Sequence, residues 1–333
     1  MKILFIGGTG IISTACAKIC LGRGIDLYCL NRGQSIRSIP SGAKVISADY
    51  FDRAEVQALI GNEVFDVVVD WIAYHPEQVQ FDHQFFHNKV GQYIFISSAS
   101  AYETPPSRLP VTEETPLSNP FWEYSRNKIS CEQYLRETYQ KDGFPVTIVR
   151  PSHTYDHTTL PFRGGYMIID RMRKGKKIII HGDGTSLWTM THADDFARGF
   201  FGLLGNQAAI GETFHITSDE WLTWNQLALL TAKAAGAGAR IIHIPSEVIA
   251  RFNADWGASL LGDKSHSMIF DNSKIKRFVP DYQTVIPFSA GIREVVQWYD
   301  ADRSRQHIDA EHDQLIDTII GHFEKYLLAG IEI

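Results

Sequence analysis

Cysteine is scarce in this sequence, and the cysteines present are not spaced as metal or redox pairs. Only 4 of the 333 residues are cysteine, and no C-x-x-C pair occurs. Cys16 and Cys20 lie one helical turn apart, where an unpaired cysteine usually packs as a small apolar residue. The pattern argues against a cysteine-based metal or redox site and predicts a reducing, cytoplasmic setting.

Long runs of one residue type are also missing. No segment approaches the roughly 18 consecutive apolar residues of a membrane-spanning helix. The apolar run at residues 3–6 is too short for a secretory signal. The formal net charge is -6 and no long basic run occurs, which argues against a dedicated nucleic-acid or membrane surface. A hydrophobic fraction of 44% is typical of a soluble globular protein with a sizeable core.

The first segment predicts a strand, then a glycine turn, then a helix. Residues 2–6 form the strand, and residues 11–21 have helical spacing with small side chains. Between them, Gly7-x-x-Gly10-x-x-Ser13 would let backbone N–H groups approach a pyrophosphate at the helix N-terminus. A glycine turn without a ligand is the alternative. The dinucleotide contacts expected here are Gly7, Gly10, Ile11 and Ile12.

A second strand, residues 25–30, ends at Asn31 and Arg32. An NAD-binding βαβ unit has an acidic residue here to hold the adenosine ribose. A neutral residue followed by a cation leaves room and charge for a 2′-phosphate, so the sequence favours NADP within an NAD(P) site. An exposed arginine of no function is the alternative. Further dinucleotide contacts are expected after the next strands, at Asp49, Tyr50, Trp71, Ile72 and Ala73.

Strands and helices alternate through the first half of the chain. Further strands are expected at 44–46, 66–70, 92–97 and 144–150, with helices at 52–60, 76–89 and from Tyr124. This alternation predicts an α/β fold with a doubly wound parallel sheet. We expect a dinucleotide-binding domain over residues 1–160, with its sheet completed by segments around 177–216. A smaller α/β substrate lobe would cover 161–333.

Two histidines of the helix at 76–89 have a spacing that zinc sites use. His83 and His87 are four residues apart and would share one helix face. No third ligand motif accompanies them, so they are interpreted as solvated or packed side chains. No metal site is therefore predicted.

The stretch from Tyr93 to Lys128 carries the groups for proton transfer. A strand ends at a hydroxyl cluster around Ser98, and Tyr124 and Lys128 follow at i and i+4 on a helix. Tyrosine is a poor base at neutral pH, but a nearby ammonium lowers its pKa. Taken alone, an exposed Tyr and Lys on an ordinary helix would explain the spacing. The glycine turn and the hydroxyl cluster favour a functional group.

Together these motifs resemble the extended short-chain dehydrogenases/reductases, and more narrowly the NAD-dependent epimerase/dehydratase family, over about residues 1 to 300. The motifs that carry the resemblance are Gly7-x-x-Gly10, Ser97-Ser98-Ala99-Ser100-Ala101-Tyr102, Tyr124-x-x-x-Lys128, Arg150-Pro151 and His192-Ala193-Asp194-Asp195. The resemblance implies a Rossmann domain, a small C-terminal substrate domain and a homodimer that pairs the helices near 76–88 and 125–141.

The resemblance also implies residue roles. Ser98, Tyr124 and Lys128 would be catalytic: Tyr124 would exchange a proton with a substrate hydroxyl as hydride passes between carbon and nicotinamide, and Ser98 would position the oxygen. Lys128, Pro151 and His153 would contact the nicotinamide side of the cofactor. Substrate contacts are expected at Ser100, Tyr74, His153 and Trp188.

Three departures from the family pattern narrow the substrate. Ala99 and Ser100 stand where sugar-nucleotide dehydratases carry Asp-Glu, so that elimination of water is not expected. Trp188 and Leu260 stand where sugar-nucleotide epimerases carry two diphosphate-binding arginines. Trp188 suits stacking on a sugar ring instead. Four other cations are open as substitutes for the arginines: Arg163, Arg171, Arg173 and Lys264.

The third departure is Ser152-His153, where the family usually has Asn after Arg-Pro. His153 is open to a substrate contact, a second titrating group or a structural hydrogen bond. The sequence predicts an NAD(P)-dependent epimerase or oxidoreductase acting on a sugar or sugar-like polyol through a keto intermediate. Two alternatives stay open: an NADPH-dependent carbonyl reductase, and an RNA-binding protein like the chloroplast stem-loop-binding proteins, against which the acidic charge argues.

Overall fold

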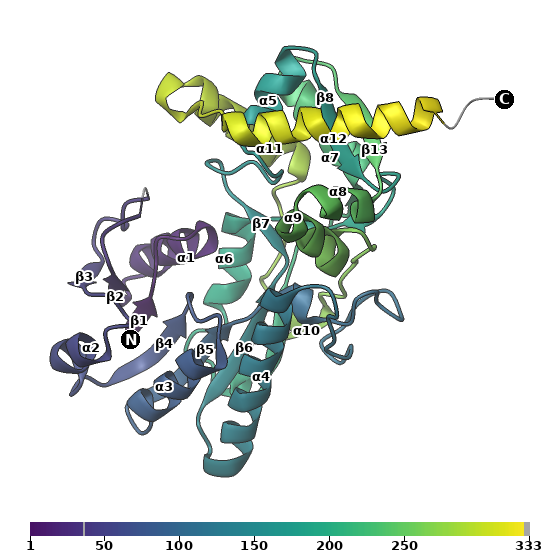
Figure 1. The fold of residues 1–333 in the computed structure, drawn as a ribbon. Coiled ribbons are helices and arrows are strands. Elements are labelled where there is room, and N and C mark those ends of the chain that lie inside the picture. The colour runs from purple at the N-terminus through teal and green to yellow at the C-terminus, as the bar shows by residue number, and fades with distance from the viewer. Residues whose placement is uncertain (36, 330–333) are drawn as a thin grey trace.

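A seven-stranded parallel sheet organises the N-terminal half of the molecule (Figure 1). The structure is a computed structural model and describes residues 1–35 and 37–329. The strand order is β11-β6-β5-β4-β1-β2-β3, with every pairing parallel. The order reverses direction next to β1, as in a doubly wound sheet, and this confirms the predicted fold class. The strands are β1 (Lys2–Ile6), β2 (Asp26–Asn31), β3 (Lys44–Ser47), β4 (Phe65–Asp70), β5 (Val90–Ile96), β6 (Val146–Pro151) and β11 (Thr213–Ile216).

Helices cover both faces of this sheet. They are α1 (Ile11–Gly22), α2 (Arg53–Ile60), α3 (Pro76–Phe86), α4 (Glu123–Asp142) and α6 (Ala193–Phe201). Helices α1 and α6 pack on one face, and α2, α3 and α4 contribute to the core on the other. The central strands are continuous apolar runs because both faces are covered. Small buried residues such as Ala15 and Ala17 let α1 lie close to the strands.

The remaining chain forms a second lobe above the carboxyl edge of the sheet (Figure 1). Its strands are β7 (His153–Tyr155), β8 (Lys177–His181), β9 (Leu187–Trp188), β10 (Met190–His192), β12 (Leu222–Thr223) and β13 (Arg240–Ile244). Its helices are α5 (Tyr166–Arg173), α7 (Trp224–Ala234), α8 (Ser246–Phe252), α9 (Ala254–Ser259), α11 (Phe288–Asp300) and α12 (Ala310–Ala329). Helix α10 (Ser273–Phe278) instead packs beside β11 of the main sheet. Short 3₁₀ turns occur at Ala99–Ala101, Gln207–Ala209 and Arg303–Arg305, and a π-helical turn at Leu260–Lys264.

Several expectations about the elements need correction. Of the segments around 177–216, β11 joins the main sheet, whereas β8 pairs with β13 in the second lobe. Residues 153–155, which follow the strand expected at 144–150, form the additional short strand β7 beside β10. The helix from Pro76 ends at Phe86 rather than Lys89, because Asn88 has a left-handed φ of 59°. Residues 330–333 of the expected C-terminal lobe lie outside the described residues, and the boundary at 160 stays a prediction.

Candidate active site

The glycine turn between β1 and α1 has the backbone shape that a phosphate-binding turn needs. Gly7 and Gly8 have φ values of 94° and 126°, which side-chain-bearing residues rarely adopt. A Cβ on Gly7 would lie 2.9 Å from Ile72 Cγ2, so the approach of the β4 loop also requires glycine. Ser13 Oγ accepts from the Gly10 N–H at 2.8 Å and so orders the start of α1. Backbone N–H groups and the positive end of α1 therefore face one groove.

The Asn31 side chain forms hydrogen bonds with the glycine turn. With its amide nitrogen toward the Gly7 carbonyl oxygen, 2.7 Å away, its oxygen accepts from Thr9 Oγ1 at 3.3 Å. Arg32 is exposed, and its Nη1 lies 3.7 Å from Asp49 Oδ2 at the end of β3. Pairs of this exposure contribute little to stability, so Arg32 is able to turn toward an anion in the groove.

A groove of about 870 Å³ runs from this turn along the sheet edge. Among the cofactor contacts expected from the sequence, those that line it are Gly7, Gly10, Asn31, Arg32, Asp49, Tyr50, Trp71 and Ile72. The Trp71 Nε1–H is buried and has no acceptor among the described residues. A polar ligand in the groove would supply one. The groove's size and its glycine cradle fit a dinucleotide.

The other expected contacts lie elsewhere. Ile11 and Ile12 pack against the core cluster that contains α1, and Ala73 is buried and gives its carbonyl to Lys128. Pro151 and His153 instead line a smaller cavity, whose wall also contains Tyr124. Sequence reasoning missed Arg37, which lines the groove and donates to the hydroxyls of Thr158 and Thr159 in the second lobe, at 2.5 and 2.7 Å. The segment around Arg37 has the composition of an ordinary polar loop, so no sequence pattern indicated this contact.

Tyr124 and Lys128 lie in the first two turns of α4, beside the end of β5. The buried face of α4 repeats at Ser125, Lys128, Glu132 and Leu135, which is helical spacing and fixes the rotation of the helix. Lys128 Nζ donates to the carbonyls of Ala73 and Ile96 at 2.6 and 2.7 Å, and lies 5.9 Å from the centre of the Tyr124 ring.

The electrostatics of this pair differ from the sequence expectation. Burial lowers the pKa of Lys128 to about 8, with partial compensation from the Asp70 carboxylate. Burial also raises the pKa of Tyr124 above its usual value; Tyr74 adds to this, and the Ser98 hydroxyl opposes it. The protein alone therefore keeps Tyr124 protonated, because desolvation by burial is the largest influence on its pKa.

A chain of hydroxyl groups lies next to Tyr124. Ser98 Oγ is 2.9 Å from Ser100 Oγ, and Ser125 Oγ donates to Ser100 Oγ at 2.8 Å. Ser98 and Ser100 both line a cavity of about 250 Å³ with Tyr124. Tyr74 closes the other side: its ring lies 5.8 Å from that of Tyr124, and it lines the long groove. The contact between Tyr74 and Tyr124 thus places a wall of the groove beside a wall of the cavity.

The second lobe completes this cavity with Asp263, which the sequence did not indicate, and with Lys264, which the sequence offered only as a substitute for a diphosphate arginine. Asp263 and Lys264 line it together with Trp122. Lys264 Nζ donates to Asp263 Oδ2 at 2.8 Å and lies 5.6 Å from the Trp122 ring centre. Asn119 Nδ2 donates to the carbonyls of Ser100 and Gly262, which ties the two lobes at this point. Trp122 lies near Tyr124 in sequence, so a local argument could have indicated it, whereas no local pattern places positions 263 and 264 beside Tyr124.

His153 lines the cavity but does not titrate near neutral pH. Burial and the positive charge of Lys264 lower its pKa to about 3. It therefore stays a neutral imidazole under ordinary conditions, which removes the role of a second titrating group. A substrate contact remains compatible with its position.

The expected role of Trp188 needs correction. Its side chain is 2% exposed in the core of the second lobe, 6.3 Å from the Trp224 ring, and it is not among the described residues that line the cavity. Strand β9 pairs with β12, and Trp188 belongs to the hydrophobic core of the second lobe. The indole therefore packs in the core instead of presenting a face to a sugar ring.

The four cations considered as diphosphate partners are engaged by carboxylates. Arg171 pairs with Asp313 and Asp317, and Arg173 with both oxygens of Asp300. Arg163 Nη1 donates to Asp255 at 3.0 Å, and Lys264 pairs with Asp263. Leu260 lines a separate apolar cavity.

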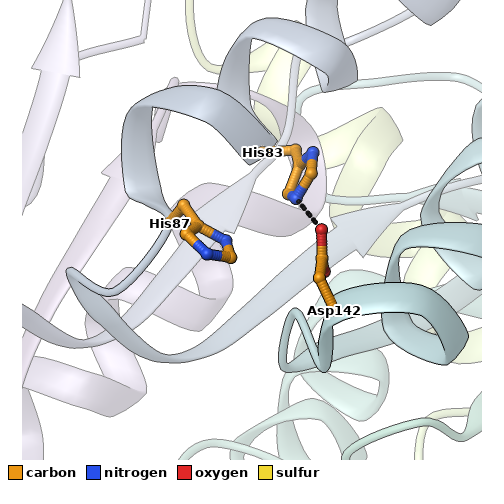
Figure 2. Close-up of side chains that lie close together, drawn as sticks. All are labelled: His83, His87 and Asp142. Atoms are coloured by element: carbon orange, nitrogen blue, oxygen red, sulfur yellow. Dashed lines mark hydrogen bonds and ion pairs between the residues drawn. The ribbon is translucent and has the colours of Figure 1, made fainter.

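His83 and His87 acquire a third potential ligand in the fold. Asp142, at the end of α4, points toward His83 from the neighbouring helix, and His87 lies beside them (Figure 2). His83 Nε2 lies 3.0 Å from Asp142 Oδ2, and its Nδ1 lies 2.9 Å from the Tyr134 hydroxyl. Both ring nitrogens of His83 thus have protein partners, so the cluster acts as a hydrogen-bonded link between α3 and α4.

Comparison with known proteins defines the family. The profile of the NAD dependent epimerase/dehydratase family matches residues 3–217. The chain belongs to this family, which confirms the resemblance carried by the sequence motifs. In the described part of the chain, no helix combines the length and apolar character needed to cross a membrane.

Individual relatives and solved structures share 30% sequence identity or less with this chain. The uncharacterized protein y4nG of Sinorhizobium fredii is 30% identical over 229 residues, covering 65% of this chain and 54% of that protein. Chloroplast stem-loop binding protein of 41 kDa b of Arabidopsis thaliana is 28% identical over 249 residues, covering 71% of this chain and 63% of that protein. The chain thus spans less than two thirds of the length of either relative.

Among solved structures, UDP-glucuronic acid 4-epimerase of Bacillus cereus, in complex with UDP-glucuronic acid and NAD, has a TM-score of 0.72. It is 20% identical, and the match covers 90% of this chain and 99% of that chain. At this identity the likeness concerns the fold.

Proposed function

We propose that this chain is an NAD(P)-dependent epimerase or oxidoreductase that acts on a secondary alcohol of a sugar or sugar-like polyol. The observation that carries the proposal is the position of Tyr124. It lines the cavity that would take the substrate, its ring lies 5.8 Å from Tyr74 of the dinucleotide-sized groove, and Ser98 and Lys128 lie beside it. Family membership supports the same class of chemistry.

The side chains divide the work at this site. Tyr124 would exchange a proton between its phenol oxygen and the substrate hydroxyl, and Ser98 Oγ would hold the same substrate oxygen. Ser100 and Ser125 would orient Ser98 through their hydroxyl chain. When bound, the nicotinamide would accept or return the hydride, and in its oxidised form it would add positive charge beside Tyr124. Since burial raises the pKa of Tyr124, this charge and that of Lys128 are both needed to form the phenolate.

The residues that would hold the cofactor follow from the groove. Gly7, Gly8 and Gly10 would admit the pyrophosphate to the N–H groups at the start of α1. Arg32 favours NADP over NAD, because its side chain is exposed and only loosely paired with Asp49. The test compares NADP and NAD affinity in the wild type and in Arg32→Ala. Stronger NAD binding in both proteins would reject the NADP preference.

The substrate is proposed not to be a standard nucleotide-diphosphate sugar. Trp188 and Leu260 replace the family's two diphosphate arginines, and the four alternative cations are paired with carboxylates. Ala99 replaces the acid of the dehydratases, so a keto intermediate without loss of water is the expected course. A simple NADPH-dependent carbonyl reductase is the alternative, since it needs the same three residues.

The decisive experiment for the chemistry is Tyr124→Phe. We expect turnover to be lost while dinucleotide binding is retained, because the hydroxyl is removed and the groove is unchanged. Full activity in this variant would reject the proposal. The dinucleotide that copurifies distinguishes the two proposed enzymes. A tightly held cofactor supports an epimerase, and a site whose cofactor exchanges supports a reductase.

RNA binding is the second candidate, because one relative is named as a stem-loop binding protein. The net charge of -6 argues against it, since RNA binding needs a positive footprint. Tight binding of structured RNA in a gel shift at physiological salt would favour it. The homodimer through α3 and α4 and the cytoplasmic setting stay predictions, and sedimentation equilibrium of the purified chain tests the first.

A further inference from the structure

A second cavity adjoins the candidate active site inside the C-terminal lobe. It has a volume of about 270 Å³ and shares His153 and Lys264 with the cavity that contains Tyr124. Because two lining residues are common to both, the second cavity begins where the first ends. A substrate held at Tyr124 and Ser98 would extend into it past His153.

The walls of this second cavity are mainly apolar. Aromatic rings come from Phe162, Trp224 and Trp256, and aliphatic side chains come chiefly from β8 and from Leu260. Leu260 stands in place of a phosphate-binding arginine, and its side chain also forms part of an apolar wall. A wall of this kind favours an apolar ring over a charged group.

Three polar side chains of the wall have partners within the protein, and one buried donor of the wall has none in the described part of the chain. Arg163 donates to Asp255, Lys264 to Asp263, and His181 Nε2 contacts the Lys264 carbonyl at 2.9 Å. Trp224 is 3% exposed, and its Nε1–H has no acceptor among the described residues. A buried donor without an acceptor is costly, and a ligand that supplies one acceptor would remove that cost.

Resting on the proposed function, we propose that this cavity binds an apolar, ring-sized part of the substrate that carries one hydrogen-bond acceptor. The reacting carbinol would lie at Tyr124, and the ring would lie between Phe162, Trp224 and Trp256. The volume lies just below the general range of ligand pockets, about 300 to 1,000 Å³, so it suits one ring and not a nucleoside diphosphate. The substrate class is thus an alcohol, ketone or glycoside with an aryl or similar apolar substituent.

The test uses a neutral aromatic probe, 4-nitrobenzyl alcohol, and follows its binding to the full chain by ligand-observed NMR titration. Ile179, on β8, lines the cavity and is only partly buried, so Ile179→Trp fills the space at limited risk to the fold. Its register partner on β13, Ile242, is not among the described residues of the cavity wall, and Ile242→Trp is the matched control. Thermal unfolding verifies that both variants are folded.

We expect the probe's dissociation constant to rise at least about ten-fold in Ile179→Trp and to change less than about two-fold in Ile242→Trp, since only the first removes apolar contact area. No binding to the wild type, or equal binding to both variants, would overturn the proposal. Tighter binding of UDP-glucose than of the probe, blocked by Ile179→Trp, would also overturn it, because the site would then take a nucleotide.

A second variant isolates the hydrogen bond. Trp224→Phe retains an aromatic ring but removes the Nε1–H, so binding of 4-nitrobenzyl alcohol should weaken by up to about ten-fold, and binding of benzyl alcohol should not. An equal effect on both alcohols would reject Trp224 as the donor. These titrations measure binding without turnover, so an active Tyr124→Phe variant would defeat the proposed chemistry and leave this result unaffected.

Discussion

Arg150 and Glu132 form a fully buried, two-pronged ion pair beneath the candidate active site. Arg150 Nε donates to Glu132 Oε1 at 2.9 Å, Nη2 donates to Oε2 at 2.5 Å, and both side chains are at most 1% exposed. Ser97 Oγ also donates to Glu132 Oε1. The pair joins β6 and the end of β5 to α4, the helix that carries Tyr124 and Lys128, and so sets the position of these two residues.

The first prediction removes one charge of this pair. Glu132→Gln keeps the shape of the side chain but leaves the Arg150 guanidinium buried without its counter-charge, so the free energy of unfolding should fall by about 3–5 kcal/mol. Urea unfolding measures the loss. Glu137→Gln, an exposed position on the same helix, is the control and should change stability by less than about 0.5 kcal/mol. Equal stability of the two variants would contradict the role of the pair.

The second prediction concerns the pH dependence that Lys128 confers on stability. Burial lowers the pKa of Lys128 in the folded chain to about 8 from its ordinary value of 10.5. Between these values the unfolded chain binds the extra proton, so this group's contribution to stability grows as pH rises from about 8 to 10.5. Below about pH 8 both states are protonated and the contribution is constant.

Lys128→Met provides the comparison for this effect. We expect the difference in unfolding free energy, wild type minus variant, to increase in favour of the wild type across that pH window. Urea unfolding of both proteins at pH values below, within and above the window measures it. A difference that stays constant with pH would show that Lys128 titrates normally in the fold.

The third prediction tests the glycine turn. Gly7→Ala places a Cβ 2.9 Å from Ile72 Cγ2 at a φ of 94°, whereas Gly24→Ala, at a φ of 71°, has no heavy atom within 4 Å. Backbone strain should lower the stability of both variants by about 1–2 kcal/mol. Only Gly7→Ala should also weaken dinucleotide binding, by more than about ten-fold, because only Gly7 lies in the groove. Calorimetric titration with NADP and NAD tests this, and equal affinities in the two variants would contradict it.

The fourth prediction concerns the link between the lobes at Asn119. Its amide nitrogen donates to the carbonyls of Ser100 and Gly262, and its oxygen accepts from the Trp122 N–H. Asn119→Ala leaves these buried groups without partners, so stability should fall by about 1–3 kcal/mol. Turnover should fall as well, since Ser100 and Trp122 line the cavity. Asn127→Ala on α4 is the control, and an equal loss there would argue against a specific link.

Local patterns were sufficient to predict the architecture and the first half of the site. The apolar strand, glycine turn and small-residue helix at the N-terminus, and the i, i+4 spacing of Tyr124 and Lys128, are set by backbone geometry within one or two turns of chain. The order of strands and helices then leaves few topologies for a parallel sheet. For these reasons the first six strands of the sheet and the residues at its carboxyl edge could be expected without coordinates, whereas the identity of the seventh strand, β11, could not.

Only the tertiary structure decided which distant residues complete the cavities. Asp263 and Lys264 reach Tyr124, Asp142 reaches His83, and β8 pairs with β13 because separate elements pack their apolar faces together. The same packing buries Trp188 and sets the pKa of Lys128, since desolvation depends on what surrounds a group rather than on its sequence neighbours. The sequence alone therefore determined the fold class and the positions of Tyr124 and Lys128 on one helix, and long-range packing determined the walls around them.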